Sequence, residues 1–194
     1  MRPLCEGYMK DRFFEKLEEL YGQMDRKWDR AARHYGFECK GCEDNCCKSL
    51  FFHHTYIEQA YLLAGFEALS LSVQKDLQKR ADAYLDTVFT PDGGVTEERP
   101  FCPLNIDGLC AVYPNRPMIC RLHGIPHHLE GADGRVVKGD GCARGQSVFM
   151  SKSYFDFDRA PFYSRMASIE IEYRNEKGLS GKTRKTVAHM IQET

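Results

Sequence analysis

Eight of the nine cysteines in this 194-residue chain fall into two blocks, and their thiols are the side chains best suited to chemistry. The first block has the spacing Cys-x2-Cys-x3-Cys-Cys, and the second is more widely spaced. A Cys-x2-Cys turn brings two sulfurs onto one ion, in zinc sites and in iron–sulfur loops alike. The pattern therefore predicts bound metal. The expected ligands are Cys39, Cys42, Cys46, Cys47, Cys102, Cys110, Cys120 and Cys142.

A disulfide framework is the other common use of so many cysteines. The N-terminal sequence lacks the apolar segment of a signal peptide, and no later run approaches the roughly 18 apolar residues that span a membrane. We therefore expect a cytoplasmic protein with no membrane partner. Reducing compartments keep thiols free, and a chain of this length does not need covalent staples. Metal binding is favoured over disulfides.

The adjacent pair Cys46 and Cys47 constrains how the thiols are shared. Neighbouring side chains usually diverge, and a disulfide between adjacent cysteines closes a strained ring. We expect the two thiols to serve different sites or shells. Eight thiols equal two four-thiolate sets, or one bimetallic centre with bridging sulfurs, and spacing alone does not decide the pairing.

The elements that must position these thiols are mostly helices, because apolar residues recur at helical spacing over several stretches. The longest stretch runs from Asp11 to Tyr35 and stops at Gly36, a residue type common after helix ends. Thr55 and Glu58 form a capping-box pattern that predicts a second helix through about residue 64. Further helices are expected from Ser70 or Ser72 to about Val88, from Pro161 to Asn175, and after Ser180.

The cysteines themselves lie among turn-forming residues, so we expect them on loops. Between Leu122 and Lys138, the turn Gly131-Ala132-Asp133-Gly134 predicts a small hairpin that returns Cys142 to the other thiols. The expected fold class is mostly α with a small β-hairpin. Residues 1–194 would form a single domain, with helices around a loop-rich, metal-held centre at residues 39–142.

Charge argues against some partners and leaves other roles open. The formal net charge is −1 and the sequence pI is about 6.7, which gives no electrostatic basis for nucleic-acid binding. Basic residues near the thiols, Arg121 above all, either neutralise thiolate charge or form ordinary surface. The histidines His53, His54, His123 and His127 are better explained as ordinary packing or surface residues than as ligands, and no HExxH pattern exists.

The cysteine segments resemble a known family. The run Cys39-Lys40-Gly41-Cys42-Glu43-Asp44-Asn45-Cys46-Cys47, then Phe101-Cys102-Pro103-Leu104, Gly108-Leu109-Cys110, Arg116-Pro117-Met118-Ile119-Cys120-Arg121 and Gly141-Cys142, is similar to the CxxCxxxCC cysteine-cluster family, the YkgJ type of zinc- or iron-chelating domain. The resemblance covers residues 39–142 and includes all eight family cysteines. It implies a bacterial metal-binding protein. Some relatives are linked to iron–sulfur chemistry, including lysine methylation of flagellin.

Three functions follow from these residues. The first is a protein that holds zinc through cysteine thiolates, mainly as a structural element and with no assignable reaction. The second is an iron–sulfur protein with a redox or transferase role, favoured by the proline after Cys102. The third is a metal carrier with exchangeable binding. Whether the chain is an enzyme stays open, because no substrate pocket follows from the sequence.

Overall fold

A computed structural model describes residues 11–39, 46–131 and 133–194, and within these ranges the chain forms seven α-helices and two small antiparallel sheets. The expectation of a mostly α fold with a small hairpin is confirmed. The helices are α1 Arg12–Tyr35, α2 Tyr56–Glu67, α3 Leu71–Val88, α4 Met118–Leu122, α5 Gln146–Met150, α6 Ala160–Lys177 and α7 Val187–Gln192. The strands are β1 Asn105–Ile106, β2 Leu109–Cys110, β3 His127–Glu130 and β4 Val136–Gly139.

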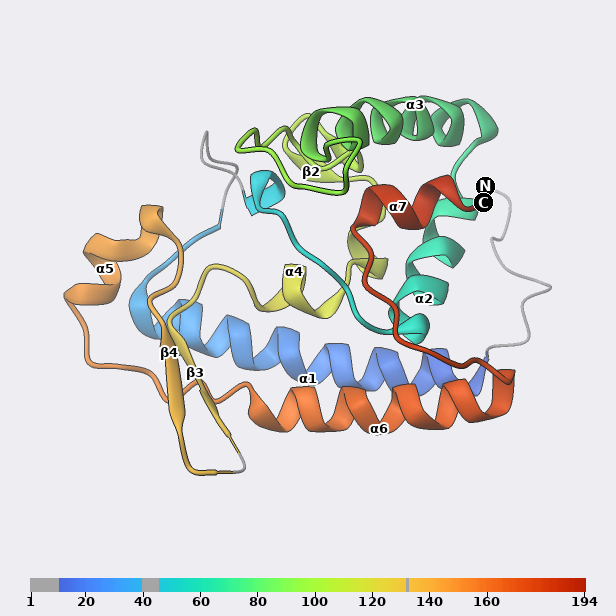
Figure 1. The fold of residues 1–194 in the computed structure, drawn as a ribbon. Helices are drawn as coiled ribbons and strands as arrows, with labels where there is room; N and C mark the ends of the chain where they lie inside the picture. The colour runs from blue at the N-terminus through green and yellow to red at the C-terminus, as the bar shows by residue number, and fades with distance from the viewer. Residues whose placement is uncertain (1–10, 40–45, 132) are drawn as a thin grey trace, which may run out of the picture.

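The long helix α1 is the base of the fold, and its ends are those the sequence predicts. The Asp11 side chain accepts a hydrogen bond from the backbone N–H of Phe13 at 3.0 Å, and Gly36 ends the helix in the left-handed conformation at φ 65°. Helix α6 lies antiparallel beside α1 (Figure 1). Phe13 meets Tyr173 edge to face at 5.3 Å between ring centroids, so the pair is held mainly by apolar packing.

Two apolar cores share helix α2. The first core packs α1 and α6 with α4, α5 and the first half of α2, where Ile57 and Tyr61 contribute. The second core packs α3 and α7 with the other half of α2, where Leu62 and Phe66 contribute. Burying apolar surface on both sides of α2 fixes the position of one core relative to the other.

The start of α2 differs from the predicted capping box. Thr55 does not cap the helix, because its hydroxyl instead donates to a carboxylate oxygen of Glu58 at 2.7 Å. The carboxylate of Glu170, from α6, accepts the backbone N–H groups of Tyr56 and Ile57 at 3.0 Å each. The first-turn amides, which a local side chain was expected to pair, are therefore paired by a residue 114 positions away.

The last helix begins later than the sequence suggests. We expected it to open after Ser180, but α7 starts at Val187 with Thr186 as its N-cap. The preceding residues cannot be helical, because Lys185 pairs with His53 in an antiparallel bridge with backbone N–H to O=C distances of 2.8 and 3.0 Å. Tertiary pairing here overrides the local helical pattern.

Two hairpins are present where one was predicted. The expected one pairs β3 with β4, with Glu130 opposite Val136. The second pairs β1 with β2 and turns through Asp107 and Gly108, both at positive φ (50° and 85°). An Asp-Gly pair with this backbone conformation is the strongest short-range hairpin signal, so this hairpin was readable from the sequence. Among the helices of the described residues, none is long and apolar enough to cross a membrane.

Candidate metal centre

All seven described members of the predicted ligand set line one cavity of about 690 Å³. The eighth, Cys42, lies outside the described residues, as does Cys5, which was not predicted to bind. The lining cysteines come from segments spread over more than half of the chain. They are Cys39, Cys46, Cys47, Cys102, Cys110, Cys120 and Cys142.

The first block joins the second through the backbone. After α1 ends, Phe37 packs in the first core and brings Cys39 to the cavity. Cys46 and Cys47 begin a short 3-10 turn, Cys46–Lys48. The carbonyl of Cys47 accepts the backbone N–H of Cys102 at 2.7 Å, so residues 55 positions apart are held side by side.

The second block is more regular than the loops predicted for it. Cys110 lies on β2, opposite Asn105 on β1, and the N–H of Asn105 donates to the carbonyl of Cys102 at 2.9 Å. Cys120 lies on the short helix α4. The expectation that all thiols sit on irregular loops is therefore wrong for these two, because the Asp-Gly turn and the buried face of α4 give the segment local order.

Two buried side chains fix α4. The carboxylate of Glu58, 4% exposed, accepts the N–H of Met118 at 2.6 Å and the hydroxyl of Tyr21 at 3.0 Å. The guanidinium of Arg121 donates to a carboxylate oxygen of Asp25 at 2.7 Å and stacks 4.1 Å over the ring of Tyr21. Cys120 is thus positioned between groups anchored in α1 and α2.

The predicted hairpin does return Cys142 to the other thiols. The N–H of Cys142 donates to the carbonyl of Gly124 at 3.0 Å, just before β3 begins. The residue before it, Gly141, has φ 81°, and a Cβ there would lie 2.8 Å from the Gly124 oxygen and 2.8 Å from the Phe149 ring. Both the conformation and the space at this position require glycine.

The variant Gly141→Ala is therefore expected to lose about 3 kcal/mol of unfolding free energy, from positive φ and from close contacts with Gly124, Pro126 and Phe149. The matched control is Gly134→Ala. Gly134 also has positive φ, at 75°, but no atom of the described residues lies within 4 Å of its Cβ position, so strain alone should cost about 1 kcal/mol. Urea unfolding of both variants measures the difference. Equal losses would contradict the close packing of Gly141.

Burial favours the protonated form of three of the thiols in this cavity. Burial raises the pKa of Cys102 to about 12, and it also raises the pKa of Cys110 and, further, that of Cys120. The charges of neighbouring cysteines add to this effect. Cys47 contributes to the raised pKa of all three.

The vicinal pair is electrostatically unequal. The hydrogen bond from the Cys46 thiol, and then the amide of Asn105, lower the pKa of Cys47 to about 6 against the opposing effect of burial. The same hydrogen bond, together with burial, raises the pKa of Cys46. The shared hydrogen bond therefore favours the thiolate form at Cys47 and the thiol form at Cys46.

The charged and imidazole groups near the thiols are largely engaged in the fold. The sequence left open whether Arg121 forms ordinary surface or neutralises thiolate charge. In the structure its side chain is buried and pairs with Asp25. His53 and His123 also line the cavity, and burial lowers the pKa of both, so both rings are neutral at neutral pH. His54 is exposed. The sequence analysis did not identify Trp28 and the other residues of α1 that line this cavity, because nothing in the local sequence marks them as part of a site.

The chemistry of these residues suits a metal ion, but their arrangement does not gather them around one. Thiolate donors suit zinc and iron, and Nδ2 of Asn105 is buried without hydrogen-bond geometry to any described group although it lies beside Cys47. Such an orphaned donor suits a charged sulfur. Within the described ranges, however, no three Cys, His, Asp or Glu side chains are gathered closely enough to hold an ion. The donor set is present, and its sulfurs are not drawn together.

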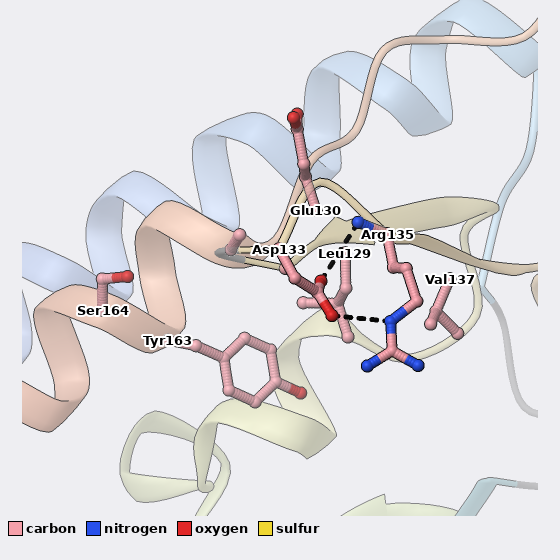
Figure 2. Close-up of a pocket in the computed structure, with 9 residues that line it drawn as sticks. Leu129, Glu130, Asp133, Arg135, Val137, Tyr163 and Ser164 are labelled. Carbon is pink, nitrogen blue, oxygen red and sulfur yellow. Dashed lines mark hydrogen bonds and ion pairs between the residues drawn. The ribbon is translucent and has the colours of Figure 1, made fainter.

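A second, shallower cavity of about 410 Å³ lies between the β3–β4 hairpin and α6 (Figure 2). Its walls are Leu129 and Val137 on the hairpin and Tyr163 on α6. Asp133 and Arg135 pair across the hairpin turn at 2.6 Å. Among the described residues, its lining includes neither cysteine nor histidine, the two residue types considered as ligands in the first cavity.

Comparison with known proteins adds no further assignment. Neither a family model, nor a curated protein, nor a solved structure matches the chain.

Proposed function

We propose that this protein binds metal through its clustered cysteine thiolates, that the metal is zinc, and that its role is mainly structural. The observation that carries the proposal is the convergence of the seven described cysteines on one cavity. Packing alone gives little reason to gather so many oxidisable thiols at one place. We also propose that the resemblance of residues 39–142 to the CxxCxxxCC family reflects the same use of these thiols.

Zinc suits the chemistry of the donors. Four thiolates close a tetrahedral site and leave no position for substrate, as in structural zinc sites. Bound zinc would crosslink loops that have few apolar contacts of their own, and it supplies no redox chemistry. The proposed ligands are the eight cysteines named above, with Cys42 outside the described residues.

An iron–sulfur centre is the second candidate. Pro103 follows Cys102 and is buried at the edge of the cavity, in the arrangement that ferredoxin-type loops often use after a ligand. A redox or transferase role would then be open to the protein. A metal carrier is the third candidate. It predicts weak binding, so that a chelator readily removes the metal.

Metal and sulfide analysis of anaerobically purified protein tests these functions. We expect colourless protein with stoichiometric zinc. Broad absorbance near ~400 nm with iron and sulfide would instead support the iron–sulfur candidate. The variant Cys120→Ser should bind less metal, and the matched control Cys5→Ser, outside the ligand set, should bind as the parent does. The proposal is contradicted if the purified protein contains neither zinc nor iron. It is also contradicted if Cys120→Ser binds as much metal as the parent.

A further inference from the structure

The β3–β4 hairpin has one covered edge and one open edge. On β3, the N–H of His128 donates to the carbonyl of Phe157 at 3.0 Å, and the carbonyl of His128 accepts the N–H of Arg159 at 2.9 Å. The segment that leads into α6 therefore covers β3. Strand β4 is the outer strand of the hairpin (Figure 1). Among the described residues, its strand partner is β3 alone.

The hydrogen-bond pattern of the hairpin shows which backbone groups of β4 point outward. The N–H of Gly131 donates to the carbonyl of Arg135 at 2.8 Å. Hydrogen-bonded pairs alternate with non-hydrogen-bonded pairs along an antiparallel ladder, so Val137, two places further along, also bonds to β3. The backbone groups of Val136 and Lys138 therefore point to the open edge. In the described part of the chain, no backbone group hydrogen-bonds to them.

The side chains at this edge are apolar and largely exposed. Val136 is 50% exposed and Val137 is 65% exposed. Leu129 lies directly opposite Val137 on β3, and both side chains line the cavity of about 410 Å³ between the hairpin and α6. Opposite residues share one face of a sheet, so these two form an apolar row that stops at the open edge. Another strand added at that edge would continue the row.

We infer that two copies of this chain pair through their β4 strands, antiparallel and centred on Val137, to form a four-stranded sheet. In this register Val136 of each copy lies opposite Lys138 of the second copy, and the two residues exchange both N–H···O bonds. Every outward backbone group of these two residues then has a partner. Val137 faces Val137 of the second copy, so the apolar row runs from one Leu129 across all four strands to the other.

Charge and backbone conformation select this register over its neighbours. A shift of two residues in one direction would place Lys138 directly opposite Lys138 of the second copy, and like charges in that position are destabilising. The same shift in the other direction would pair Lys138 with Gly134, whose φ of 75° is not that of an extended strand. A shift of one residue would set outward backbone groups against inward ones. The centred register avoids all three conflicts.

Opposite charges at position 137 test the pairing, because this residue faces itself across the twofold axis. An edge pairing of this length buries little surface, so we expect association only at high concentration. In sedimentation equilibrium of the reduced full chain, the mass should rise from 22.3 kDa toward twice that value. Val137→Asp and Val137→Lys should each stay monomeric, and an equimolar mixture of the two should associate again.

The matched controls are Ile171→Asp and Ile171→Lys. Ile171 is 58% exposed, close to the exposure of Val137, and it lies on α6, outside the hairpin. Both controls should associate as the wild type does. Since both positions are largely exposed, all four variants should fold, and circular dichroism of each one establishes this before sedimentation.

Hydrogen exchange read by NMR at single amides tests the register. The N–H groups of Val136 and Lys138 should become protected only at concentrations where the dimer forms. The N–H of Val137, which bonds to β3 within each copy, should be protected at all concentrations. Lys138→Pro removes an outward N–H without removing a bond of the hairpin, so it should weaken association by about 10-fold or more while the Val137 amide stays protected.

Each result either supports or overturns the pairing. A wild-type chain that stays monomeric at every concentration overturns it and leaves Lys138 as a guard of the open edge. Association that the two Val137 variants do not weaken, or that their mixture does not restore, overturns this interface. Exchange at Val136 and Lys138 that does not change with concentration overturns the register. The proposed metal binding uses none of these residues, so it stands or falls separately.

Discussion

Complete removal of metal is expected to unfold residues 100–117 while α1 and α6 stay folded. In the part of the chain that is described, regular structure in this segment is limited to two-residue strands and one 3-10 turn. Leu104 and Val112 are its buried aliphatic side chains, beside the buried rings of Pro103 and Pro117. Structural zinc in zinc-finger peptides contributes about 10–16 kcal/mol to folding, far more than two such side chains. Under the proposed metal binding, we therefore expect these loops to depend on metal for order.

Helices α1 and α6 serve as the internal reference for this experiment. They share an extensive apolar core, and ion pairs such as Lys177 with Asp11 at 3.3 Å join their ends. Hydrogen exchange read by mass spectrometry, before and after anaerobic chelation, compares the two regions in one sample. We expect protection to be lost in residues 100–117 and retained in α1. Retained protection in both regions after complete demetallation would contradict a structural role for the metal.

The parts of the fold that the sequence predicted are those with local causes. The bounds of α1 follow from an N-cap aspartate, a helical apolar stripe and a glycine at the C-cap. The start of α3 at Leu71, with Ser70 as its N-cap residue, and the hairpin around Gly131 and Gly134 also agree with the nearby sequence. Local hydrogen bonding and steric preference are enough to specify such elements.

The errors arise where a distant partner decides. The cap of α2 comes from Glu170, and the late start of α7 comes from the pairing of Lys185 with His53. Neither partner is identifiable from spacing. The β1–β2 hairpin is a different kind of error, because its Asp107-Gly108 turn was visible in the sequence.

The candidate site was predictable in composition but not in arrangement. Cysteine spacing indicated which residues gather, and the described ones do line a single cavity. Spacing could not show that the backbone carbonyl of Cys47 accepts a hydrogen bond from the N–H of Cys102, or that Asn105 lies beside Cys47. Folding alone brings these segments together. Likewise, the position next to Cys120 did not reveal whether Arg121 is surface or interior.

Replacement of Arg121 by alanine is expected to lower the free energy of unfolding by about 3 kcal/mol. The side chain is 6% exposed, and its guanidinium also donates to the carbonyls of Pro114 and, at 2.9 Å, Arg116. Alanine would leave those carbonyls unpaired and remove the cation from the Tyr21 ring. Lysine should recover less than half of the loss, because a single ammonium cannot reproduce the fork of donors.

Arg116→Ala is the matched control, because Arg116 meets the same carboxylate of Asp25 at 3.6 Å. Asp25 is 41% exposed, so water replaces a lost partner there and the cost should stay below about 1 kcal/mol. Urea unfolding followed by fluorescence of Trp28, the one tryptophan, measures both variants. Equal losses would assign the effect to Asp25. A larger loss in Arg121→Ala, with faster thiol labelling of Cys120, would assign it to the buried carbonyl bonds that hold α4 against the cavity.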